Sequence, residues 1–297
     1  MKNRPQIGVS LRSLNLDAND FLERVEEVNK FNPSSIELMG FNMDLLNKGK
    51  ILNSKTDKIK KILYGYNFIK TMHGPLSVNF LDKADILDDH FNVCISYINL
   101  AKILGVTSIV LHTGFCEFSD QNSLNIKYNK QSDYLRRIAD LAGENEISIL
   151  IENIFPFFKN AHTASPTYLR DELAKINHPY LKGCLDVSHA YIFCSCSNED
   201  FLKNIKDFGQ YSKHWHVHDS YGKSDVLFKP FNQSEALAYG IGDLHLPLGD
   251  GDLPWQKIIN LTQPDNETMF NIELNPRYWS ELGRCFSYLR KLLEKYN

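Results

Sequence analysis

The sequence predicts a single-domain α/β fold, a (β/α)8 TIM barrel over residues 1–297. Short runs of apolar and β-branched residues alternate eight times with longer amphipathic stretches. The runs are nearly continuous in apolar residues, as in parallel strands that are covered on both faces. No linker or low-complexity segment divides the chain, and its length is ordinary for one closed barrel.

The expected elements follow one another as strand and helix along the whole chain. The strands are expected at residues 6–12, 35–39, 69–73, 108–112, 148–152, 181–186, 214–218 and 269–273. The helices are expected at residues 17–31, 54–64, 83–104, 134–144, 166–176, 199–211, 254–261 and 279–295. Ser165 precedes Pro166 as an N-cap precedes a proline in the first helical turn, and Pro254 suits a first turn as well.

A doubly wound open sheet is the alternative to a barrel. Its dinucleotide-binding form needs a G-x-G-x-x-G motif after the first strand, and no such motif is present. One long irregular stretch, residues 221–251, separates the seventh strand from its helix. Because loops of this length in a compact domain usually carry function, we expect it to contribute to the site.

Composition excludes several classes of protein. The formal net charge is −3, so no overall basic field points to nucleic acid or anionic lipid. The first ten residues lack a signal-peptide core and no later run is long enough to span a membrane, so no membrane partner is expected. The six cysteines follow no disulfide or CxxC pattern, which indicates reduced, mostly buried thiols and a cytoplasmic protein.

Residues that bind metal ions stand where the expected strands end. In TIM barrels the C-terminal strand ends build the active site, so these side chains should meet at one face. So many buried carboxylates and imidazoles would be costly to desolvate without divalent cations, for which both are natural ligands. The candidate ligands for zinc or manganese are His73, His112, Glu152, Asp186, His189, His216, Asp243, His245 and Glu273.

The seventh strand offers three histidines, of which we expect one to be a ligand. His216 and His218 are two residues apart, and we expect one ligand from this pair, with His216 preferred. His218 is then expected to contact the substrate or to support a ligand. His214 should point the same way as His216 but deeper in the barrel. Asp186 and His189 are three residues apart at a strand-to-helix turn, where both can face the barrel mouth.

Several of these motifs resemble endonuclease IV, the zinc-dependent apurinic/apyrimidinic endonuclease (family 2) of DNA repair, within the xylose isomerase-like superfamily. The resemblance covers most of the chain and is sharpest in residues 184–190, 216–219, 243–251 and 272–276. It implies three zinc ions: one on His73, His112 and Glu152, a second shared by Glu152 with Asp186, His216 and Glu273, and a third on His189, Asp243 and His245. Glu152 and Glu273 would be the catalytic carboxylates that position a water near a phosphodiester.

The sequence also departs from endonuclease IV where that family contacts DNA. The loop after the third strand is Gly74-Pro-Leu-Ser77 in place of a tyrosine-bearing loop, although Leu76 could still act as an apolar wedge between bases. Leu244 stands where the family has an arginine near the phosphate. The resemblance implies a hydrolase of abasic-site DNA, and these departures leave a small phosphodiester open as the alternative substrate.

A sugar isomerase or epimerase of the same superfamily is the alternative. Glu152, Asp186, His216 and Glu273 resemble its single-metal site, which would hold one manganese, magnesium or cobalt ion. Glu152 and Glu273 would then move a proton as a carboxylate pair. This alternative assigns no role to four of the candidate ligands, which are His73, His112, Asp243 and His245.

Overall fold

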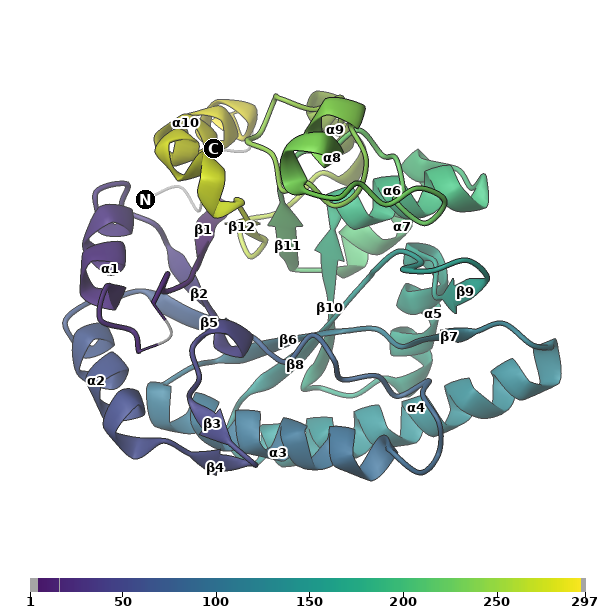
Figure 1. Cartoon of the computed structure of the whole chain (residues 1–297), viewed down its shortest axis with the longest axis horizontal. Helices are drawn as coiled ribbons and strands as arrows, with labels where there is room; N and C mark the ends of the chain where they lie inside the picture. Colours follow the sequence, from purple (N-terminus) through teal and green to yellow (C-terminus); the bar gives the residue numbers. More distant parts are fainter. Residues whose placement is uncertain (1–4, 16, 295–297) are drawn as a thin grey trace.

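Eight parallel strands close into a barrel in the computed structural model, which describes residues 5–15 and 17–294 (Figure 1). The neighbours around the barrel are β1, β12, β11, β10, β8, β6, β5 and β2, so each strand pairs with those adjacent in sequence order. Their bounds are β1 Gln6–Leu11, β2 Ser35–Met39, β5 Ile69–His73, β6 Ser108–His112, β8 Ser148–Glu152, β10 Leu181–Asp186, β11 His214–Val217 and β12 Met269–Ile272. The predicted closed (β/α)8 barrel is confirmed, and the open sheet is excluded.

Helices surround the strands on the outside (Figure 1). They are α1 Phe21–Asn29, α2 Asn53–Tyr64, α3 Leu87–Leu104, α4 Gln121–Gly143, α5 Pro166–Ile176, α6 Val187–Ser197, α7 Phe201–Tyr211, α8 Gln233–Tyr239, α9 Trp255–Thr262 and α10 Leu282–Leu292, with short 3-10 helices at Gly40–Asn42 and Pro276–Glu281. Two antiparallel pairs lie outside the barrel: β3 Leu46–Asn47 with β4 Lys50–Ile51, and β7 Phe115–Glu117 with β9 Ala161–Thr163.

Several helix boundaries differ from the expected ones. Helix α4 begins at Gln121 rather than residue 134, because the Asp120 side chain caps it by accepting from the backbone N–H groups of Asn122 and Ser123. Helices α6 and α8 were not expected at all. Ser165 caps α5 with Pro166 in its first turn, as predicted. The expected end of the last helix at residue 295 lies outside the described residues.

Alternate residues of each strand face the helices or the barrel interior. The outward residues are apolar and belong to the main core, as with Val9, Leu38, Ile151 and Trp215. Inside, a small apolar cluster of Val110, Leu150 and Cys184 fills one side of the barrel. Several further inward positions are polar, among them Ser10, Glu37, Thr71 and Asn271, and they form a buried hydrogen-bonded layer beneath the strand ends.

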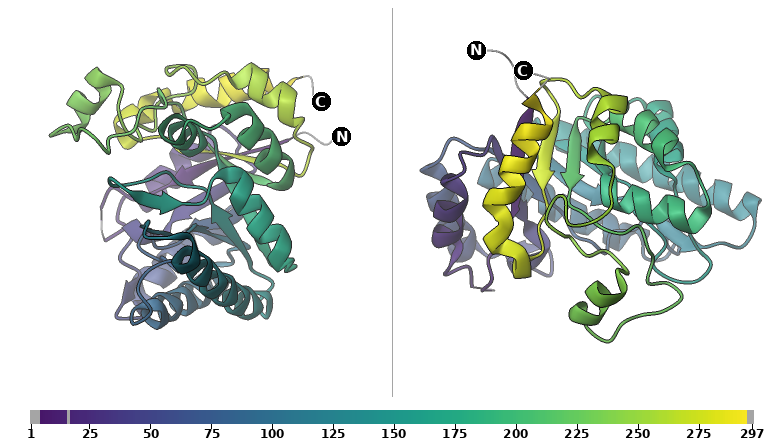
Figure 2. Two further views of the ribbon diagram at one scale, coloured as in Figure 1. Left: turned by 90° about the vertical axis from the view of Figure 1, so that its right-hand side faces the viewer. Right: turned by 90° about the horizontal axis from the view of Figure 1, so that it is seen from above.

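The chain between β11 and α9 stands out from this architecture. Both views of Figure 2 show α8 and its flanking segments protruding from the barrel. Within the described part of the chain, no helix combines the length and the apolar character needed to cross a membrane. The six cysteines are free thiols, and five of them are buried.

Candidate metal centre

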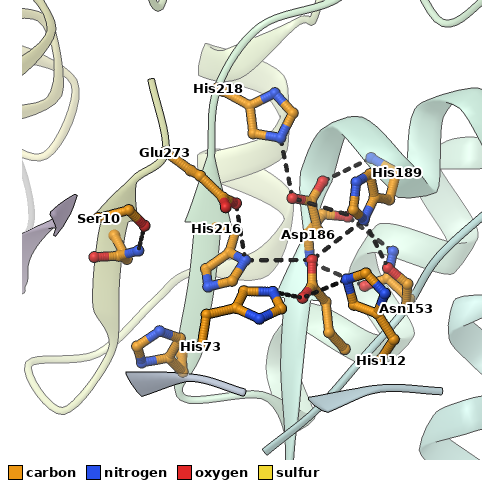
Figure 3. Close-up of polar contacts among 12 residues, drawn as sticks. Ser10, His73, His112, Asn153, Asp186, His189, His216, His218 and Glu273 are labelled. Carbon is orange, nitrogen blue, oxygen red and sulfur yellow. Dashed lines mark hydrogen bonds and ion pairs between the residues drawn. The ribbon is translucent and has the colours of Figure 1, made fainter. Parts of the chain in front are cut away.

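The nine candidate ligands come together at the C-terminal ends of the barrel strands. Figure 3 shows six of them around a common centre, contributed by separate strands and by helix α6. Because the strands are parallel, each strand end delivers its last inward side chain to the same face. Four ligands are the last residues of their strands: His73, His112, Glu152 and Asp186. His216 is the penultimate residue of β11, Glu273 directly follows β12, His189 lies in the first turn of α6, and Asp243 and His245 lie on the long loop.

Glu152 lies at the middle of this cluster and is fully buried. Its Oε2 atom lies 3.2 Å from Nε2 of His73 and 3.6 Å from Nε2 of His112. Its Oε1 atom lies 3.2 Å from Nδ1 of His216 and 3.2 Å from Nδ1 of His189. One carboxylate oxygen therefore faces His73 and His112 and the other faces His216, as expected of a carboxylate that bridges two cations.

A second group forms around Asp243, on the long loop between β11 and α9. Its Oδ2 atom lies 2.7 Å from Nε2 of His245 and 3.2 Å from Nε2 of His189. His245 has a left-handed backbone, with φ of 46°, and this turns its ring back toward Asp243. The loop thus adds two donors that no strand could supply.

Asp219 holds this loop in place. Its backbone pairs with that of Leu246 in both directions, with N···O distances of 2.9 and 3.0 Å. Its buried carboxylate accepts hydrogen bonds from the backbone N–H of Gly249 at 2.8 Å and from the Trp255 indole at 3.0 Å. A Cβ atom at Gly251 would lie 2.3 Å from the carboxylate, so only glycine fits there. Asp219 therefore determines where Asp243 and His245 stand.

Backbone carbonyl groups orient three of the histidine rings. Nδ1 of His73 lies 3.1 Å from the Gly74 carbonyl oxygen, and Nδ1 of His245 lies 3.0 Å from that of Glu273. Nδ1 of His189 lies 3.0 Å from the carbonyl oxygen of Asn153. When Nδ1 donates to these carbonyls, the lone pair of the neutral ring is on Nε2, which faces the cluster. Metal-binding histidines are held in this way.

The donor spacing fits metal ions. Two ligand atoms of one tetrahedral zinc lie about 3.4 Å apart, given Zn–N distances of about 2.0–2.1 Å. The His73 and His112 contacts with Glu152, at 3.2 and 3.6 Å, match this spacing. The donor atoms of Asp186, His189 and His218 also lie within 4.8 Å of one another. Among the described residues, Oδ1 of Asp243 is buried without a hydrogen-bond partner, and a cation would satisfy it.

The pKa values of the histidines and carboxylates in this cluster are shifted by burial and by the neighbouring charges. Burial alone would lower the pKa of His245, but the Asp243 carboxylate raises it to about 10. Burial would raise the pKa of Glu273, but His216 lowers it to about 2. Burial lowers the pKa of His112 to about 4. Without a metal, protons on some histidines balance the carboxylates, and metal binding would release those protons.

Sequence reasoning missed Glu37, a fully buried carboxylate on β2. Its Oε1 atom lies 2.9 Å from Nε2 of His216, and its Oε2 atom lies 2.9 Å from Nε2 of His214. Thr71 donates a hydrogen bond to it at 3.1 Å and Asn271 donates one at 3.3 Å. These histidines hold the pKa of Glu37 well below its usual range against the effect of burial. Alternation along the strand Ser35-Ile-Glu37-Leu-Met39 was the available signal, because it points Glu37 inward.

His218 follows His216 by two residues and also faces the cluster, because residues i and i+2 of an extended chain point to the same side. Strand β11 ends at Val217, and His218 is the next residue. Its Nε2 atom lies 3.1 Å from Oδ2 of Asp186, and its ring stacks on His245 with centroids 4.0 Å apart. Its Nδ1 atom has no hydrogen-bond partner among the described residues. His218 is buried and does not line the cavity described below.

A cavity of about 610 Å³ opens above the cluster. Donor residues form part of its wall, including Glu152, Asp243 and Glu273. Leu76 lines it too and is 42% exposed, on the segment after β5. Further apolar lining comes from Phe41, Phe115, Phe157 and Trp279. The cavity is large enough for a small organic substrate next to the metal donors.

Comparison with known proteins identifies the family. The family model described as "Xylose isomerase-like TIM barrel" matches residues 25–288. The chain belongs to this family. No curated protein matches the chain.

Solved structures share the fold of this xylose isomerase-like protein at low sequence identity. A D-tagatose 3-epimerase-like protein is 18% identical, with a TM-score of 0.71 and 98% of each chain covered. A D-psicose 3-epimerase, solved in the presence of D-fructose, is 15% identical with a TM-score of 0.69, covering 97% of this chain and 99% of its own. Endonuclease IV from Thermus thermophilus is 16% identical with a TM-score of 0.65, covering 98% of this chain and 100% of its own.

Proposed function

We propose that this protein is a metal-dependent phosphodiester hydrolase that holds three zinc ions, as its resemblance to endonuclease IV implies. The observation that carries the proposal is the size of the donor set. A single metal ion would need only Glu152, Asp186, His216 and Glu273. The structure gathers five further donors beside these four: His73, His112, His189, Asp243 and His245.

The donor geometry supports the grouping into three sites. His73 and His112 share one oxygen of Glu152, whereas His216 and His189 face the other. Asp243 links His189 with His245. His218, which contacts Asp186, would support the second site from behind. Bound zinc ions would neutralise the carboxylates, attract a phosphate group and lower the pKa of a water molecule in the site.

The protein's own residues supply the remaining functions. Glu273 lines the cavity and stays ionised at neutral pH, so it can accept a hydrogen bond from an attacking water. Glu152 is held by histidines on both oxygens and would set the spacing between two ions. Leu76, exposed beside the cavity, would contact a base or another apolar part of the substrate. Abasic-site DNA is the first substrate to test, followed by small phosphodiesters.

A sugar epimerase is the second candidate, favoured by the structural similarity to D-tagatose 3-epimerase-like and D-psicose 3-epimerase proteins. In that reaction one ion would hold the sugar, and Glu152 and Glu273 would remove and return a proton. Both carboxylates lie within 3.2 Å of Nδ1 of His216, which is consistent with a shared ion.

Metal content and activity together test the proposal. The zinc-loaded protein should contain three zinc ions per chain by elemental analysis. It should cleave an abasic-site duplex or bis(4-nitrophenyl) phosphate, a strong chelator should abolish this activity, and phosphate should inhibit it competitively. One ion per chain, together with interconversion of a ketose and its epimer and no phosphodiester cleavage, would replace the hydrolase with the epimerase.

A further inference from the structure

Arg12 directly follows strand β1, at the end of the strand where most other barrel strands provide a metal donor. It follows Ser10 by two residues, so both side chains lie on the same side of the chain. Ser10 faces the barrel interior, where it accepts a hydrogen bond from Asn271 at 2.8 Å (Figure 3). Arg12 comes directly after the end of β1 at Leu11 and lines the cavity above the donor cluster. A cation therefore stands where its neighbours supply carboxylates and imidazoles.

Arg12 is the single lysine or arginine among the described residues that line this cavity. Four carboxylates line the same cavity: Asp82, Glu152, Asp243 and Glu273. Yet no carboxylate oxygen of the described residues comes within 4.0 Å of the Arg12 guanidinium, and its buried Nε atom has no hydrogen-bond partner. Asp82 faces His90 instead, at 3.6 Å. The positive charge of Arg12 is thus uncompensated within the protein.

Arg24, unlike Arg12, has carboxylate partners among the described residues. It lies near Arg12 in a small recess that both share with Trp279, and it contacts Glu27 at 2.8 Å and Asp20 at 3.8 Å. Arg24 is therefore neutralised by its own neighbours. Burial and then the charge of Arg24 both lower the pKa of Arg12, so the surroundings disfavour the charged form rather than stabilise it. Such a partly buried, unpaired guanidinium gains most from an anion that enters with a ligand.

We infer that Arg12 binds a second anionic group of the substrate, a phosphate or a carboxylate, while the reacting group lies at the donor cluster. The planar guanidinium can donate two parallel hydrogen bonds to either group. The inference rests on the proposed function in one respect, namely that the substrate occupies this cavity with one anionic group at the metal ions. A binding role for Arg12 would limit the substrates to molecules that carry two anionic groups.

Binding of alkane bisphosphonates to the zinc-loaded protein tests this inference without turnover. Calorimetry would compare bisphosphonates of increasing chain length with alkylphosphonates of the same lengths. The wild type should bind one length of bisphosphonate about tenfold more tightly than its alkylphosphonate, and Arg12→Gln should remove most of this preference. Arg12→Lys should retain part of it. The matching ω-phosphonocarboxylates would reveal whether the distal group is a phosphate or a carboxylate.

Arg24→Gln is the matched control, because it removes a nearby arginine that already has carboxylate partners; the preference should survive. Zinc content and melting temperature equal to wild type would establish that each variant is folded. Equal binding of both probe types by the wild type, or a preference that survives in Arg12→Gln, would overturn the inference. A preference that depends on Arg12, in a protein that cleaves neither an abasic-site duplex nor bis(4-nitrophenyl) phosphate, would support the role of Arg12 while rejecting the hydrolase.

Discussion

Glu37 and His216 meet inside the barrel, with Oε1 of Glu37 2.9 Å from Nε2 of His216. The opposite ring nitrogen, Nδ1, lies 3.2 Å from Glu152 and 3.1 Å from Glu273. His216 is therefore held from behind by one carboxylate while it faces two others. A carboxylate behind a metal-binding histidine fixes the ring orientation and makes the ligand more basic.

Replacing Glu37 should weaken metal binding although Glu37 is not itself an expected ligand. Glu37→Gln keeps the size of the side chain but removes the charge behind His216, so zinc affinity should fall about 10- to 100-fold. Competition with a zinc-binding dye measures this affinity. Glu172→Gln is the matched control, because Glu172 is also buried but pairs with Gln131 on the outer helices, at 3.0 Å. Unchanged zinc affinity in Glu37→Gln would show that His216 needs no such support.

The bridging position of Glu152 predicts that one substitution removes both zinc and activity. Glu152→Gln should lose zinc and nearly all activity together, because its two oxygens face separate histidine pairs. Elemental analysis and a phosphodiesterase assay on the same samples measure both. Full zinc content in this variant would contradict the bridging role.

His216 and His218 should differ as metal ligands. His216→Ala should lose zinc, because its Nδ1 atom faces both Glu152 and Glu273. His218→Ala should keep its zinc, because the contact of His218 is with the already ligating Asp186. Zinc content after dialysis distinguishes them. The reverse result would assign the ligand to His218, beyond the end of the strand.

The pKa of His245 predicts how the metal-free protein responds to pH. Its folded-state pKa of about 10 lies above the ordinary value of 6.5, so protonated His245 stabilises the fold below pH 6.5. That contribution should disappear as the pH rises from 6.5 to 10. Urea denaturation of chelated wild type and His245→Asn should therefore show a stability difference that shrinks over this window. Zinc affinity should change in the opposite sense and rise with pH, because binding displaces protons.

Asp219 should control the stability of the loop that carries Asp243 and His245. Asp219→Asn turns an amide N–H toward buried N–H donors, which should cost about 2 kcal/mol of unfolding free energy. Zinc content should also fall by one ion, because two donors of the third site lose their support. Asp250→Asn in the same loop is the control: its partner is Arg284 at the surface, and such pairs contribute about 0–1 kcal/mol. An Asp219→Asn variant with full stability and zinc content would contradict the role assigned to Asp219.

The barrel and most of the donor set were predictable because both depend on local periodicity. All eight strands lie where apolar runs predicted them, and His73, His112, Glu152 and Asp186 end their strands as expected. Parallel pairing then brings those ends to one face whatever the details of packing. The first half of helix α4, residues 121–133, was not predicted: it is rich in polar residues, and the Asp120 cap begins it well before the expected start at residue 134.

Tertiary structure decided what depends on contacts between distant segments. The role of Glu37 depends on histidines that lie 177 residues or more away in the chain, so only barrel closure reveals it. His218 contacts Asp186 on the neighbouring strand β10, and the Asp219–Leu246 pairing determines that the long loop delivers Asp243 and His245. Among the described residues Arg12 has no carboxylate partner, whereas Arg24, which shares a recess with it, contacts Asp20 and Glu27. The sequence pattern predicts which way a side chain points. The residues that this side chain contacts depend on which segments the closed barrel brings together.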